Sequence, residues 1–133
     1  SFTADYLWDS CRGRRVAIKQ HLMNGKVVVG AGNIYATEAL FRAGIRPSRA
    51  AGRISRKRLA LLVDRLRDVL REAVERGGTT LRDYVGTDGN PGYFKLDLDV
   101  YDREGMPCKR CGAAIRRAVI GQRAAFFCAR CQR

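Results

Sequence analysis

The chain has 133 residues, of which 46% are hydrophobic and 29% are charged, a balance typical of a globular protein of one medium domain or two small ones. No apolar run approaches the ~18 residues of a membrane span, and the first ten residues have no basic stretch before an apolar one. Neither a membrane protein nor a signal peptide is predicted, and the net charge of +13 indicates a polyanionic partner.

The positive charge is concentrated in two segments. Residues 11–49 and residues 105–133 each carry a net charge of +7, whereas residues 50–104 are nearly balanced at +1. Such clustering is typical of a surface that binds nucleic acid. The alternative is a basic surface that only aids solubility. A membrane surface is not favoured, because no predicted helix combines a basic face with a wide apolar one.

Two short helices are predicted near the N-terminus, over residues 3–11 and 14–24. The second is stopped by Asn24-Gly25. Cys11 is far along the chain from the other four cysteines and is interpreted as a small buried hydrophobe. His21, the only histidine, is interpreted as a helix-surface or partly buried residue and not as a catalytic base.

A glycine-rich turn, Gly30-Ala-Gly-Asn33, opens the third predicted helix. Asn33 is expected to cap that helix, and Gly44 is expected to end it. A helix N-terminus carries free N–H groups, and glycines let an anion approach them closely, so the turn is a candidate phosphate site. Such turns are more often only turns, but the position of this one inside a strongly basic segment favours phosphate binding.

A long amphipathic helix follows. Ser55 is its expected N-cap, Gly77-Gly78 end it, and its apolar residues recur at three- and four-residue steps, so we interpret it as scaffold. Residues 79–84 are predicted to form a short helix and residues 86–94 a glycine-rich loop. Residues 95–101 are predicted to be extended.

Four of the five cysteines occur as two C-x-x-C pairs separated by sixteen residues. Four thiolates at this spacing are typical of a closed, tetrahedral, structural Zn²⁺ site, and two disulfides are the main alternative. Strands at residues 114–121 and 124–128 are expected to form a hairpin around Gly121-Gln122-Arg123, whose folding would depend on the metal. The expected ligands of the single Zn²⁺ are Cys108, Cys111, Cys128 and Cys131.

Four motifs, in this order, resemble the bacterial formamidopyrimidine-DNA glycosylase family: GAGNIYATEALFRAGIRP, GGTTLRDYVGTDGNPGYF, VYDREGMPCKRCG and FFCARCQR. The resemblance covers essentially the whole chain. It implies a mainly α fold, with a helix–two-turn–helix domain over residues 1–104, a lesion-lid loop at residues 86–95, and a β-hairpin zinc finger over residues 105–133. It also implies a glycosylase and abasic-site (AP) lyase that excises oxidised purines, 8-oxoguanine and formamidopyrimidines, in base excision repair.

The resemblance also implies roles for residues that match the family's motifs. Asn33 matches an asparagine that contacts a phosphate beside the lesion, and Arg123 matches an arginine that grips the same backbone and is implicated in the second elimination step. Arg14 corresponds to a basic DNA-contacting residue, and Lys19 to a lysine linked to activity on oxidised guanine. We expect Arg14, Asn33 and Arg123 to converge on one positive face. The residues that resemble the lid over the extruded base are Asp88, Gly89, Asn90, Pro91, Gly92, Tyr93 and Phe94.

The family's nucleophile has no counterpart in this sequence. Members begin with a proline whose amine attacks the sugar C1′, followed by a glutamate that acts as an acid, whereas this chain begins Ser1-Phe2-Thr3. We therefore expect a fragment that lacks the N-terminal catalytic domain and is inactive alone. Asn90 stands where some members have lysine, which leaves the lesion preference open.

Other functions stay open at this stage. The related endonuclease VIII branch prefers oxidised pyrimidines, but the loop GTDGNPGYF and the motif VYDREGMPC favour the purine-directed branch. A non-enzymatic module is the second alternative, because similar helical folds and zinc ribbons occur in a ribosomal protein and in RNA-binding proteins. A zinc-stabilised protein adaptor leaves the basic segments unexplained. We expect a monomer in the bacterial cytoplasm, associated with the nucleoid, that binds damaged double-stranded DNA and no membrane.

Overall fold

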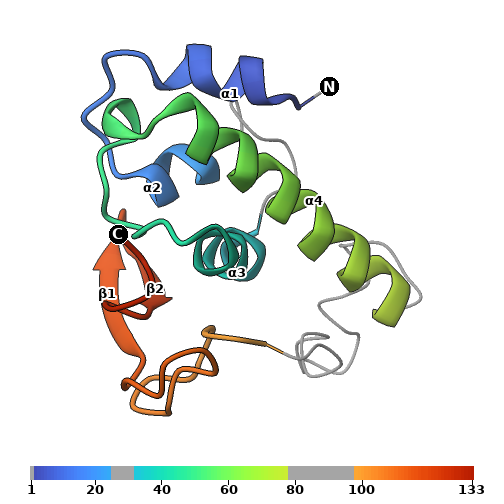
Figure 1. Ribbon diagram of the computed structural model, residues 1–133, viewed down its shortest axis with the longest axis vertical. Coiled ribbons are helices and arrows are strands. Elements are labelled where there is room, and N and C mark those ends of the chain that lie inside the picture. Colours follow the sequence, from blue (N-terminus) through green and yellow to red (C-terminus); the bar gives the residue numbers. More distant parts are fainter. Residues whose placement is uncertain (1, 25–31, 78–97) are drawn as a thin grey trace.

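The computed structural model describes residues 2–24, 32–77 and 98–133. Within these ranges the fold is mainly α with one small antiparallel hairpin, as predicted (Figure 1). The predicted helix at 79–84 and the lid at 86–95 lie outside the described residues. The elements are α1 (Ala4–Cys11), α2 (Ile18–Met23), α3 (Asn33–Ala43), a 3-10 turn (Ala51–Arg53), α4 (Arg56–Gly77), β1 (Arg116–Ile120) and β2 (Arg123–Phe127).

Helix α3 lies between α4 and the hairpin (Figure 1). Helix α4 packs against both α1 and α3, and its apolar residues face their shared core, as expected for a scaffold helix. No helix in the described ranges is long and apolar enough to cross a membrane. The α4 residues buried in this core, each at most 3% exposed, are Leu59, Leu62, Val63, Leu66, Val69 and Ala73.

Helix α2 begins later than predicted. Residues 14–17 lie alongside residues 49–52, and the N–H of Gly52 donates to the Arg14 carbonyl at 2.9 Å. A Cβ on Gly52 would lie 2.8 Å from that carbonyl oxygen, so glycine is required for this approach. The helical prediction was wrong for residues 14–17 because their backbone polar groups find partners far along the chain, which local periodicity does not reveal.

Of the helix ends predicted for α3 and α4, the N-terminal cap of α3 was wrong, whereas the C-terminal end of α3 and the N-terminal cap of α4 were correct. The N-cap of α3 is Gly32, and Asn33 is the first helical residue, so the predicted cap was wrong. The Asn33 side chain donates to the Ala124 carbonyl in β2 at 3.0 Å and is thereby turned away from a capping position. Gly44 ends α3 with a φ of 72°, and the Ser55 hydroxyl accepts an N–H from the first turn of α4 at 3.2 Å, both as predicted.

The hairpin is closed by a tight turn. Gly121 and Gln122 have φ values of 59° and 68°, as a two-residue type I′ turn requires. Arg123 therefore lies outside the turn and begins β2, opposite Ile120. The hairpin has a second, smaller core to which α3 contributes Phe41. The other buried members of this core are Val100, Cys108, Ile115, Phe126 and Cys128.

Candidate zinc centre and nucleic-acid interface

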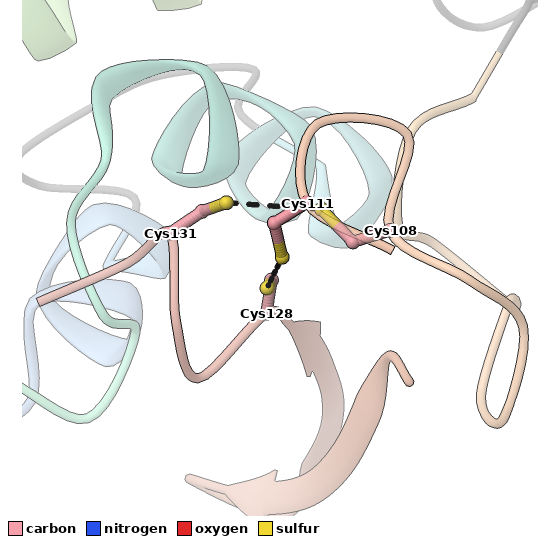
Figure 2. A group of neighbouring side chains, drawn as sticks. All are labelled: Cys108, Cys111, Cys128 and Cys131. Atoms are coloured by element: carbon pink, nitrogen blue, oxygen red, sulfur yellow. Dashed lines mark hydrogen bonds between the residues drawn. The ribbon is translucent and has the colours of Figure 1, made fainter. Parts of the chain in front are cut away.

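The four predicted zinc ligands converge at one point. Cys108 and Cys111 lie on the loop before β1, Cys128 and Cys131 lie on the loop after β2, and the four side chains point toward one another (Figure 2). Their sulfur atoms all lie within 4.8 Å of one another. The Sγ atoms of Cys108 and Cys131 are 3.8 Å apart, and those of Cys111 and Cys128 are 3.5 Å apart. Sulfurs at ~2.3 Å from a tetrahedral Zn²⁺ are about 3.8 Å apart, so the cluster fits one zinc ion.

The same distances exclude the disulfide alternative. Disulfide sulfurs are ~2.05 Å apart, and all four cysteines are free thiols here. Burial and the three neighbouring cysteine sulfurs raise the pKa of Cys131 to about 12, so four thiolates at this point need a dication to stabilise their charge. Because the protein supplies all four ligands, the zinc is structural, which confirms the prediction.

A buried carboxylate joins α3 to the segment that leads into the zinc module. Glu38 is 1% exposed, and its two oxygens accept three backbone N–H groups from residues 99–101 at 2.6 to 2.9 Å. Burial raises the pKa of Glu38, although the three N–H donors oppose that rise. Residues 99–101 form a bend and the start of a turn around the carboxylate, so the extended conformation predicted for residues 95–101 was wrong at these three.

A buried amide joins the second zinc knuckle to the end of α3. The Gln132 side chain is fully buried, accepts the Cys128 N–H at 2.8 Å and donates to the Ile45 carbonyl at 2.9 Å. Next to it, the Arg133 N–H donates to the Gly44 carbonyl at 3.0 Å. The segment that leads into the zinc module is therefore hydrogen-bonded to α3, and the C-terminal end of the module is hydrogen-bonded to the residues just after α3.

Two of the predicted DNA-binding residues converge on one carbonyl oxygen of β2. Lys19 Nζ donates to the Ala124 carbonyl at 3.1 Å, and Asn33 Nδ2 donates to the same oxygen at 3.0 Å. Lys19 is 1% exposed, and burial together with the charge of Arg123 lowers its pKa to about 8. Ala124 directly follows Arg123, so both side chains fix the backbone from which Arg123 projects.

The other two predicted residues line one open groove. Arg14 and Arg123 are both exposed, and they face a groove of about 570 Å³ between α2 and the tip of the hairpin. The tip contacts α2 closely, since a Cβ on Gly121 would lie 3.0 Å from Gln20 Cδ. Within the part of the chain that the structure describes, neither arginine has a carboxylate partner.

A buried histidine, His21, lines the same groove. The Ser10 hydroxyl donates to the Leu7 carbonyl at 2.8 Å, so its oxygen accepts from His21 Nε2 at 3.0 Å. Burial and the charge of Arg14 lower the pKa of His21. His21 is 5% exposed, more buried than the sequence predicted, while Cys11 is fully buried as predicted. The histidine thus joins α1 to α2 beside the groove.

Sequence reasoning missed the groups that hold the two parts of the site together. Glu38 carried a usable signal, because it is the only acid within residues 11–49 and an isolated acid in a basic segment calls for a structural partner. Gln132 carried none, since a glutamine beside the last zinc ligand is unremarkable in sequence. The direct DNA contacts of Arg14, Lys19, Asn33 and Arg123 stay predictions, as does the role of Arg123 in the second elimination step.

Within residues 2–24, 32–77 and 98–133, four packed helices are joined to a four-cysteine hairpin, the architecture of a helix–two-turn–helix protein with a zinc finger. Residues 1–85 match the formamidopyrimidine-DNA glycosylase H2TH domain, and residues 105–133 match the zinc finger found in FPG and IleRS. The chain therefore belongs to the formamidopyrimidine-DNA glycosylase family.

Similar proteins agree in sequence and in structure. The formamidopyrimidine-DNA glycosylase of Ralstonia pickettii is 58% identical over 99% of this chain and 45% of its own length. MutM (Fpg) from Thermus thermophilus is 40% identical with a TM-score of 0.85, covering 98% of this chain and 50% of that one. Lactococcus lactis Fpg, solved with abasic-site DNA, is 29% identical with a TM-score of 0.85, covering 99% of this chain and 48% of that one. The chain spans about half the length of the relatives it matches.

Proposed function

We propose that these 133 residues are the DNA-binding half of a DNA glycosylase and AP lyase that excises oxidised purines from double-stranded DNA. The observation that carries the proposal is the groove between α2 and the hairpin, where Arg14 and Arg123 are exposed and have no carboxylate partner among the described residues. Backbone phosphates supply the missing negative charge, and contacts of this kind position a protein on DNA without reading its sequence.

The roles within the proposed site follow from exposure. Arg14 and Arg123 contact phosphates directly, and Arg123 also takes part in the second elimination step. Asn33 uses one amide N–H for Ala124 and has a second one for a phosphate beside the lesion. Lys19 is buried and acts on the hairpin backbone. Zinc, when bound, supplies only the crosslink that keeps β1 and β2 in place.

The ligands of solved relatives support this substrate class. Lactococcus lactis Fpg is described in complexes with abasic-site DNA and with Fapy-dG DNA, and MutM in a complex with carbocyclic 8-oxo-G DNA. We assign residues 1–104 to the helix–two-turn–helix domain, residues 86–95 to the lid over the extruded base, and residues 105–133 to the zinc finger. We expect the protein to work on chromosomal DNA at the bacterial nucleoid.

We expect these residues alone to bind damaged DNA but to leave the base in place, because the family's N-terminal proline and glutamate are not among them. Incubation with an 8-oxoguanine duplex, followed by alkali and gel analysis, tests this expectation. Strand cleavage above background would contradict it.

The test of the proposal is fluorescence anisotropy with two labelled duplexes, one holding a stable abasic-site analogue and one undamaged, across a salt series. We expect zinc-dependent binding, and Arg123→Ala should lower the salt slope by about one unit because one phosphate contact is lost. Arg71→Ala is the matched control, since Arg71 lies on α4 beside Asp68. No binding to either duplex at low salt, or equal effects of the two variants, would overturn the proposal.

A further inference from the structure

Two neighbouring segments of the helical domain carry an unusual excess of positive charge. Residues 11–24 and 44–58 together contain ten lysines and arginines and no aspartate or glutamate. Their backbones are hydrogen-bonded to each other from Arg14 to Gly52, at the close approach that Gly52 permits. The fold therefore places two acid-free basic segments side by side, which costs electrostatic energy unless an anion lies against them.

Several arginines inside and outside these segments have partners, and within the second segment Arg56 is paired with Asp5 of α1. Arg42 forms a bidentate pair with Glu72, and Arg103 donates to two backbone carbonyls. By contrast, Arg14, Arg15 and Arg53 are exposed, and none of them has a carboxylate or side-chain hydrogen-bond partner in the residues that the structure describes. These guanidinium groups are free to bind an external anion.

The free arginines lie along a continuous surface. Arg14, Arg15 and Arg53 line a shallow depression of about 460 Å³. Arg14 also lines the groove that holds Arg123, so the depression and the groove meet at Arg14. We call the surface formed by Arg123, Arg14, Arg15 and Arg53 the basic track. It leads from the tip of the hairpin to the 3-10 turn.

We propose that the basic track binds backbone phosphates of the DNA duplex flanking the lesion, with Arg15 and Arg53 as contacts beyond the groove. The inference rests on the proposed function, and it extends the DNA contact past the residues that hold the lesion. A duplex carries one negative charge per ~1.7 Å of its axis, so a row of unpaired guanidinium groups matches its charge pattern. Arginine suits this role because its planar fork binds phosphate oxygens in pairs.

The test compares the double variant Arg15→Ala/Arg53→Ala with the unchanged chain on three abasic-analogue duplexes. One is a core duplex short enough to reach only the groove, and the other two extend it by about one helical turn on either side of the lesion. We expect the salt slope of the double variant to fall by about two units on one extended duplex and to stay unchanged on the core duplex.

A matched control keeps the loss of charge constant. The double variant Arg67→Ala/Arg71→Ala removes two exposed charges from α4 and should leave all three slopes unchanged. Zinc content and melting temperature of each variant show that it is folded. The inference is overturned if the track variant changes none of the slopes, changes all three equally, or matches the control. Failure of the unchanged chain to bind any duplex would instead overturn the proposed function.

Discussion

Replacing Lys19 by methionine tests whether the buried charge destabilises the fold while its hydrogen bond to β2 supports DNA binding. The ammonium is 1% exposed, and its pKa is lowered from 10.5 to about 8, which corresponds to ~3 kcal/mol against the charged form in the folded state. The Ala124 carbonyl keeps its second donor, Asn33, when Lys19 is lost. Lys19→Met should therefore leave the melting temperature at pH 7 unchanged or raised.

The same substitution should weaken DNA binding. Loss of one of the two hydrogen bonds that hold the Ala124 carbonyl loosens the backbone next to Arg123, and one hydrogen bond contributes about 1 kcal/mol net. We expect a roughly five- to tenfold loss of duplex affinity in fluorescence anisotropy. In an Arg123→Ala background the loss should nearly vanish, because Lys19 acts through Arg123 and the two effects are not additive.

Arg71→Met is the control for a lost surface charge, since Arg71 is exposed on α4 and lies outside the two basic segments. It should change affinity less than Lys19→Met does. Fully additive losses from Lys19→Met and Arg123→Ala would contradict the indirect role of Lys19, because they would mean that Lys19 contacts DNA by itself. A fall in melting temperature of more than roughly 5 °C would refute the expected cost of the buried charge, since that is about 1 kcal/mol of stability for a domain of this size.

Three further outcomes are expected. Between about pH 8 and 10.5 the unfolded chain keeps the Lys19 proton that the folded chain releases. The free energy of unfolding of the unchanged chain should therefore rise by about 2 kcal/mol relative to that of Lys19→Met between about pH 7.5 and 9.5, as measured by denaturant titration. A constant difference would contradict the lowered pKa of Lys19. Glu38→Gln should lower the free energy of unfolding by about 2 kcal/mol, because an amide has one oxygen to accept the three N–H groups of residues 99–101. Unchanged stability would show that these contacts do not matter. Gly52→Ala should lower the free energy of unfolding by about 2 kcal/mol, because the added Cβ would clash with backbone atoms. Gly105→Ala is the control, since its Cβ would meet no atom within 4 Å and would test backbone strain alone. Equal losses of stability would argue against the clash.

The sequence predicted best what is encoded locally. The paired cysteines specify the zinc site because each C-x-x-C brings two sulfurs together within a few residues, and Ser55 and Gly44 specify helix ends by their own chemistry. The family resemblance added the fold of the whole chain. Neither source depended on contacts between distant segments.

What failed depends on partners far along the chain. Residues 14–17 have a helical pattern of side chains, but their backbone pairs with residues 49–52. Asn33 is a good capping residue by type, yet its amide is drawn to Ala124, 91 positions away. The bend and turn at residues 99–101 are set by Glu38. In each case a tertiary hydrogen bond overrides the local preference, and the local preference carries no trace of the partner.

The Gln132 side chain couples the stability of the zinc finger to that of the helices. One buried amide bonds both the Cys128 N–H of the zinc knuckle and the Ile45 carbonyl just beyond α3. Opening either side leaves half of that amide desolvated and unbonded, so each side loses stability when the other opens. We therefore expect the finger and the helices to melt in one cooperative transition, so a chelator that removes zinc should lower the unfolding temperature of helices that do not contact the metal.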